Sequence, residues 1–231
     1  GAEPFGKGTR NPVACPAEGL GDLRGMRADS GGLTLSLSAT PLAGLAEGME
    51  QLLEYPYGCT EQTVSRMVPL LALRDLADSL GVRLPQSPPG PRPGGELAGV
   101  LRNAVDTVIK NQRRDGGFGL WPTSGESHPW ITAYALWGLG EARRRGLPVR
   151  EEVTKRAEQY LAQSPRENPT PRDLAQDAFT VHVLAEDGRP DLDRAAALYA
   201  ARDRLPLFGR ALLLHAMARS GRAKPEEIAE L

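Results

Sequence analysis

The sequence predicts an all-α fold built as an array of helical hairpins. From residue 40 onward, apolar residues recur at helical spacing in one short segment after another, and polar or Pro- and Gly-rich turns separate these segments. Period-2 alternation is clear at one place only, Leu33–Ser38. Short helices joined by short turns pack as antiparallel hairpins, so we expect a curved or closed two-layered array.

Composition excludes several classes of function. The 231 residues suffice for one large domain with a buried core. A net charge of −1 gives no basic surface for nucleic acid, and no apolar run approaches the roughly 20 residues of a membrane helix. The two cysteines and three histidines have no zinc-site spacing. We therefore expect no nucleic-acid partner, no direct membrane insertion, no metal and no cofactor.

Residues 1–39 are predicted to be an N-terminal linker. The first 31 residues are rich in Gly and Pro without a sustained period, and Leu33–Ser38 then reads as a half-buried strand. A lone strand cannot complete a sheet, so we expect it to pair with a neighbouring β domain. Gly1-Ala2 resembles a cleavage or cloning remnant, which suggests that the chain was cut from a longer protein.

Residues 40–231 are predicted to be the helical domain. Pro69 lies inside the second apolar stripe and should kink that helix or shift its start. Ile131–Leu139 and Leu212–Met217 are apolar most of the way round, which is typical of inner helices. Helical apolar stripes run from Leu42 to Leu53 and from Val64 to Leu80, and further helices are predicted near residues 96–113, 130–146, 151–163, 172–187, 191–203 and 207–220, with a last one starting at Pro225.

The segment YPYGCTEQ carries the chemistry. Residues three apart on a helical turn are neighbours, about 5 to 6 Å apart at Cβ, so the Cys59 sulfur can reach the Gln62 carboxamide. Attack there would form a γ-glutamyl thioester with loss of ammonia. The free N–H groups at the start of a helix stabilise a thiolate, which makes Cys59 both a better nucleophile and a better leaving group.

Such a bond hydrolyses if water reaches it, so the sequence should also supply cover. Tyr55 and Tyr57 directly precede the motif and are large and rigid. Phe118, Trp121 and Trp130 could add to the shield, although ordinary packing is the alternative for each of these rings.

YPYGCTEQ followed by TVSRMVPLLAL resembles the thioester region of bacterial α2-macroglobulins, in the wider α2-macroglobulin and complement-like family. The family motif Cys-x-Glu-Gln is matched by Cys59, Glu61 and Gln62, with Thr60 in the variable place. The stretches DGGFGLW and HPWITAYALWGLGEARRRG also look like this family. We assign Glu61 no role beyond a hydrogen bond that orients the turn.

The resemblance implies an α/α toroid of six helical hairpins, inserted through linker strands such as Leu33–Ser38. Nine helices are predicted here instead of twelve, so either C-terminal hairpins are absent or some helices have been merged. It also implies a protease inhibitor acting as a single-use covalent trap, not an enzyme, in which Gln62 acylates a lysine amine of the attacking protease. The periplasm or cell envelope is the location it suggests.

In some complement relatives a histidine first takes the acyl group. His128 is the nearest candidate but does not match that place, so we expect direct reaction with amines. Three alternatives remain open: a terpenoid-type enzyme, since Gln112 with Asp115–Trp121 resembles a cyclase repeat; a thiol hydrolase or acyltransferase pairing Cys59 with a distant histidine; and an inert binding module.

Overall fold

The computed structural model describes residues 58–80, 97–122, 125–164 and 169–221, together with Leu52 and Glu226. The predicted strand Leu33–Ser38, Tyr55 and Tyr57 lie outside the described residues. The expected boundary between residues 39 and 40 also lies outside them, so the division into linker and helical domain stays a prediction.

Helices make up almost all of the regular structure in the described ranges. The one β-type pairing there is an isolated antiparallel bridge between Gln112 and Phe118, which confirms the all-α class. The helices are α2 (Thr60–Leu80), α3 (Leu97–Lys110), α4 (Pro129–Arg144), α5 (Glu151–Ala162), α6 (Pro171–Glu186), α7 (Leu192–Ala200), the 3₁₀ helix η2 (Arg202–Arg204) and α8 (Leu207–Ser220).

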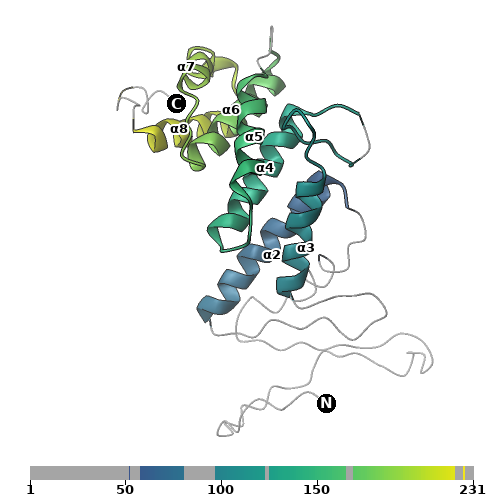
Figure 1. Cartoon of the computed structure of the whole chain (residues 1–231). Helices are drawn as coiled ribbons and strands as arrows, with labels where there is room; N and C mark the ends of the chain where they lie inside the picture. The colour runs from purple at the N-terminus through teal and green to yellow at the C-terminus, as the bar shows by residue number, and fades with distance from the viewer. Residues whose placement is uncertain are drawn as a thin grey trace, which may run out of the picture. The chain divides into compact units, whose positions relative to one another are not determined.

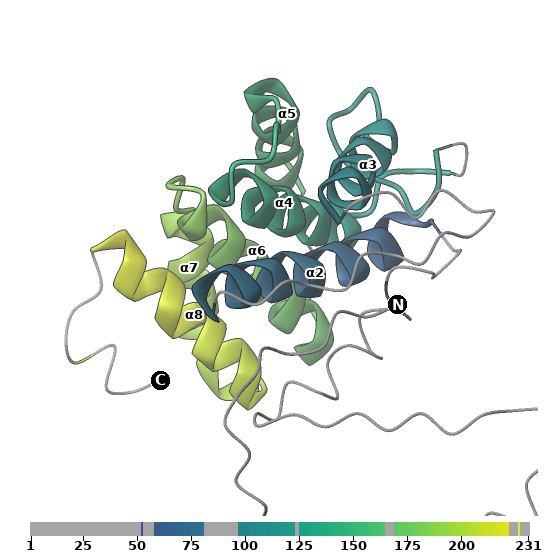
Figure 2. The same ribbon diagram turned by 90° about the horizontal axis from the view of Figure 1, so that it is seen from below.

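Helix α4 is the central element of the described part. It packs against α2, α3, α5 and α6, and α6 in turn packs against α7 and α8 (Figures 1 and 2). Nine residues of α4 are buried, and several of them belong to the larger of two apolar clusters. The prediction that Ile131–Leu139 is an inner segment is therefore confirmed.

Helix α8 departs from the prediction. It buries Leu213, Ala216 and Met217 in a second cluster with α6 and α7. At its start Leu207 and Phe208 are 83% and 58% exposed, and His215 is exposed further along. Within the described part, Leu212–Met217 is thus covered on one side only, because the elements that pack on α8 are α6 and α7.

Local sequence sets several helix ends. Helix α6 begins with a capping box, in which Thr170 Oγ1 accepts from the Asp173 N–H at 3.3 Å and Asp173 Oδ2 accepts from the Thr170 N–H at 3.0 Å. Helix α8 ends at Ser220, and the following residue, Gly221, has a φ of 66°, which favours glycine. The helix predicted over residues 191–203 is shorter, because it ends at Ala200 and η2 follows.

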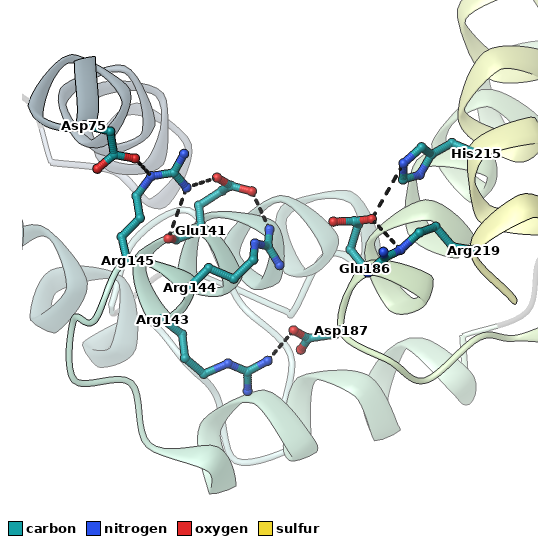
Figure 3. A network of polar contacts seen from close by, with 9 residues as sticks. All are labelled: Asp75, Glu141, Arg143, Arg144, Arg145, Glu186, Asp187, His215 and Arg219. Carbon is teal, nitrogen blue, oxygen red and sulfur yellow. Dashed lines mark hydrogen bonds and ion pairs between the residues drawn. The ribbon is translucent and has the colours of Figure 1, made fainter. Parts of the chain in front are cut away.

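Helix α2 contains Glu61 and Gln62 of the motif in its first turn, and α2 packs against α4. Helix α2 starts at Thr60 and runs through the exposed Pro69, so this proline does not shift the start of the helix. Its inner face approaches α4 closely, since a Cβ on Gly138 would lie 2.6 Å from Cγ1 of Val64. Towards its other end, Asp75 Oδ2 pairs with Arg145 Nε at 2.5 Å, as Figure 3 shows. Both ends of α2 are therefore tied to the central helix.

Candidate functional site

Cys59 lies directly before α2, in the position of an N-cap residue. Its sulfur accepts a hydrogen bond from the backbone N–H of Gln62 at 3.3 Å, and its carbonyl accepts from the Thr63 N–H at 2.9 Å. Serine, threonine, asparagine and aspartate oxygens usually make this side-chain contact. The Cys59 sulfur is not in a disulfide, and the residue is only 7% exposed. The predicted one-turn spacing of Cys59 and Gln62 is therefore present, with the sulfur over the start of the helix.

The helix start stabilises negative charge on this sulfur. The first N–H groups of a helix have no partner within the helix, and its N-terminus carries a partial positive charge. The N–H of Gln62 supplies one of these donors to Cys59. A thiolate formed or released here is stabilised by the residue that also carries the carboxamide.

Thr60 joins the motif to the turn-rich segment after α3. Its N–H donates to the Leu120 carbonyl at 2.8 Å, and its hydroxyl donates to the Gly119 carbonyl at 2.5 Å. The same hydroxyl accepts from Asn111 Nδ2 at 2.9 Å. Thr60 is fully buried and Asn111 is 1% exposed. Residues about 50 to 60 positions apart in the chain are thereby fixed beside the candidate cysteine.

The segment DGGFGLW forms a tight turn against α4 and α5. Asp115 Oδ1 accepts from the Gly117 N–H at 3.0 Å, and Gly116 has a φ of 93°. A Cβ at Gly116 would lie 2.4 Å from the Arg156 carbonyl oxygen, so the position requires glycine. Phe118 is fully buried, and its N–H donates to Thr132 Oγ1 at 2.8 Å. This turn brings Gly119 and Leu120 to Thr60.

The predicted shielding residues have different surroundings. Trp121 is 45% exposed at the end of the turn. Trp130 is partly buried and packs with Tyr134 and Phe179, at ring-centroid distances of 5.8 and 5.0 Å. Its role as cover stays a prediction, as does that of Tyr55 and Tyr57, which lie outside the described residues.

His128 is an N-cap residue of α4. Its Nδ1 accepts from the Trp130 N–H at 3.2 Å, and its own N–H donates to the Phe118 carbonyl at 3.0 Å. Its side chain is exposed. No hydrogen bond in the described ranges joins Cys59 to His128, His182 or His215.

Glu61, the third matched residue of the motif, links α2 to α4. Its Oε1 accepts from the Ser65 hydroxyl at 2.9 Å, and the Ser65 oxygen lies 2.9 Å from the Tyr134 hydroxyl. Tyr134 belongs to the aromatic group with Trp130 and Phe179. Glu61 thus reaches α4 through Ser65, which lies one turn further along α2, and the motif alone does not predict this link.

Two adjoining hollows lie beside the turn. One, of about 630 Å³, is lined by residues that include Leu120, His128 and Trp130. The other, of about 660 Å³, runs past Trp130 to Leu205 and Phe208. Trp130, Arg172 and Gln176 line both, so we call the pair the Trp130 groove. The groove places exposed apolar surface next to the segment that contacts Thr60.

Gln112, the glutamine of the cyclase-like stretch, has a structural role in the turn. Gln112 Nε2 donates to the carbonyls of Gly116 and Val153, so the cyclase-like glutamine holds the turn. In the described ranges no group of three or more His, Cys, Asp or Glu side chains is placed to hold a metal ion. No described helix combines the length and the apolar character needed to cross a membrane.

Sequence analysis missed Thr60, Asn111 and Thr132 as residues that shape the site. Thr60 stood in the variable place of the motif, although a hydroxyl-bearing residue beside the cysteine was a usable signal. Asn111 and Thr132 carried no signal, because their partners lie 51 and 14 positions away.

The chain is similar to known proteins over most of its described residues. Residues 32–174 match the family model described as the A-macroglobulin TED domain. The alpha-2-macroglobulin of Escherichia coli K12 is 30% identical over 153 residues, which are 64% of this chain and 8% of that protein. The chain therefore spans a small fraction of the length of this relative.

Two solved structures have the same fold. Native alpha-2-macroglobulin from Escherichia coli, from domain MG7 to the C-terminus, aligns with a TM-score of 0.64 and 23% identity, covering 80% of this chain and 30% of that one. Salmonella alpha-2-macroglobulin reacted with methylamine aligns with a TM-score of 0.61 and 28% identity, covering 80% and 12%. The likeness confirms the predicted α/α toroid of helical hairpins.

Proposed function

Because the chain belongs to the family described as the A-macroglobulin TED domain, we propose that Cys59 and Gln62 form an internal thioester that an external amine consumes once. The observation that carries the proposal is the hydrogen bond from the Gln62 N–H to the Cys59 sulfur at 3.3 Å. It places the nucleophile and the residue bearing the carboxamide on one turn at the start of α2. The methylamine-reacted Salmonella structure supports reaction with amines in a relative.

Both steps balance without a cofactor. In formation, the Cys59 sulfur attacks Cδ of Gln62, an S–C bond replaces the C–N bond, and the thiol proton leaves with the amide nitrogen as ammonia. In use, an amine attacks the same carbon, a C–N bond replaces the C–S bond, and the amine proton goes to the departing thiolate. The chain ends as an amide with a free thiol. Since the thioester is not regenerated, the domain is a single-use acylating reagent and not an enzyme.

The surroundings of the motif support storage of a reactive bond. Cys59 is 7% exposed and Thr60 is fully buried beneath Gly119 and Leu120, which limits the access of water. The Trp130 groove adjoins Leu120 and offers apolar surface to a covering element. We propose that neighbouring β domains of a longer protein complete the cover, together with Tyr55 and Tyr57.

In that longer protein, the proposed role is inhibition of proteases by covalent trapping through their lysine amines. Exposure of the thioester after attack by a protease would permit acylation of the attacker by Gln62. A protease trap acts where foreign proteases arrive, so the proposed location is the periplasm or cell envelope, in bacterial defence. These statements rest on family membership and on the motif.

Intact mass spectrometry tests the chemistry directly. We would use a Cys15→Ser background, so that Cys59 is the one thiol to be counted. The expected protein is lighter than its sequence by one ammonia. Methylamine then adds its own mass and releases a thiol that reacts with iodoacetamide.

The Cys59→Ala variant in the same background is the control, and it should have its full sequence mass and ignore methylamine. A mass one unit above the sequence mass, with Glu found in place of Gln62, would mean that the bond formed and was hydrolysed. An unmodified Gln62 in protein that has its full sequence mass would refute the thioester.

A further inference from the structure

We propose that Thr60 and Asn111 together are positioning residues for the thioester, an inference that rests on the proposed function. Neither side chain has a reacting atom. Their contacts determine where the backbone of Cys59 lies relative to Gln62, and so whether the sulfur reaches the carboxamide carbon.

Thr60 forms three hydrogen bonds to residues outside the motif. Its hydroxyl accepts from Asn111 Nδ2 at 2.9 Å and donates to the Gly119 carbonyl at 2.5 Å, while its N–H donates to the Leu120 carbonyl. The residue bonded directly to Cys59 is thus held by three groups of the segment after α3. A rotation of the Cys59–Thr60 link would break these bonds in a buried place.

The backbone N–H groups at the start of α2 each have a defined acceptor. The Thr60 N–H is taken by Leu120, the Gln62 N–H by the Cys59 sulfur, and the Thr63 N–H by the Cys59 carbonyl. Because the Thr60 N–H is bonded to the Leu120 carbonyl outside the helix, Cys59 is held in its capping position over Gln62. Reacting atoms must approach to about 3 to 3.5 Å, and a misplacement of about 1 Å costs roughly a hundredfold in rate.

Asn111 is a costly residue for packing alone. It directly follows α3 and is 1% exposed, and its Oδ1 has no hydrogen-bond partner in the described ranges. A buried unpaired acceptor lowers stability, whereas an apolar side chain at the same place would not carry that cost. Asn111 is therefore better explained by the bond that its Nδ2 makes to Thr60 than by its contribution to the core.

The test measures the rate of thioester formation, from the sum of intact thioester and Glu at position 62 at successive times. The rate of methylamine incorporation is measured on the same samples. Thr60→Val removes the hydroxyl but keeps the shape, and Asn111→Leu removes the donor. We expect each variant to form thioester at least about tenfold more slowly than wild type. Thr60→Ser retains the hydroxyl and should stay within about twofold of wild type.

Thr180→Val is the matched control. Thr180 is also a buried threonine, and its hydroxyl donates to the Gln176 carbonyl on α6, away from the motif. It should lower the unfolding midpoint by less than Thr60→Val, which leaves the buried Asn111 donor without this partner, and it should leave thioester formation unchanged. The double variant Thr60→Val/Asn111→Leu should be no slower than Thr60→Val alone, because Thr60→Val already removes the bond to Asn111.

Normal thioester formation in folded Thr60→Val, or an equal loss in Thr180→Val, would overturn the positioning role. If folded Asn111→Leu alone kept the wild-type rate, Asn111 would drop out of the proposal. A wild-type protein with an unmodified Gln62 would instead refute the proposed function, and with it the positioning role.

Discussion

The sulfur of Cys59 caps α2 by accepting a hydrogen bond from the N–H of Gln62 at 3.3 Å. Cys59 thus closes the helix end and carries the proposed nucleophile, while Gln62 supplies the capping donor and the carboxamide. The capping function and the proposed chemistry can be separated by substitution, because an oxygen can cap but does not reproduce the thiol.

Cys59→Ser should therefore keep the helix start and lose the thioester. Serine is among the favoured N-cap residues, whereas alanine at this position typically costs about 0.5 to 2 kcal/mol. Urea unfolding should rank Cys59→Ser above Cys59→Ala by about 1 kcal/mol, and neither variant should show the loss of ammonia by mass. Equal stability of the two variants would contradict a capping role for the sulfur.

Gly138→Ala should separate α2 from α4 and weaken the fold. The added Cβ would lie 2.6 Å from Cγ1 of Val64 and 3.3 Å from Cε of Met67, both fully buried, so the helices must move apart. Overpacking of this kind costs about 1 to 3 kcal/mol. Thermal unfolding should show a lowered midpoint.

Gly140→Ala is the matched control for this change, because it introduces the same residue on the same helix. Its Cβ would lie 3.4 Å from Nη1 of the flexible Arg144 side chain and 3.6 Å from Asp187 Oδ1, which are ordinary contact distances. A helical Gly→Ala change gains up to about 1 kcal/mol, so the midpoint should stay or rise. If both variants were destabilised alike, close α2–α4 packing would not be the cause.

His182 should make the stability of the α6–α8 pair depend on pH. Burial lowers the pKa of His182 from 6.5, and His215, whose ring centroid lies 4.8 Å away, lowers it further. Glu186 opposes this shift and Arg144 adds to it. The unfolded chain then binds more protons than the folded one, so stability should be lost as pH falls through about 6.5 and below.

Urea unfolding at several pH values checks this prediction. In His182→Gln the fall in stability between about pH 7 and pH 5 should be smaller than in wild type. His215→Gln, which changes the half-exposed partner, should reduce the fall less. A steeper fall in His182→Gln than in wild type would contradict the assigned direction.

Ion pairs between different helices could not be predicted from the sequence pattern, whereas Arg145 and Glu141 are four residues apart and form a local pair. Arg145 joins Asp75 of α2 to Glu141 of α4, Arg143 reaches Asp187 after α6, and Glu186 meets Arg219 of α8 (Figure 3). Charged residues in the last turn of a helix are a recognisable pattern. Their choice of partner is not, because it is set by which helices become neighbours.

The sequence by itself determined what depends on neighbours within one turn. Within the described residues, the helical segments, the capping box at Thr170, the glycine that follows α8 and the spacing of Cys59 and Gln62 follow from local backbone geometry. Only the tertiary structure decided that Thr60 is held by Asn111 and that α8 leaves Leu207 and Phe208 exposed. The physical reason is that these features depend on contacts made or left open after distant segments have packed together, and periodicity within one segment carries no information about them.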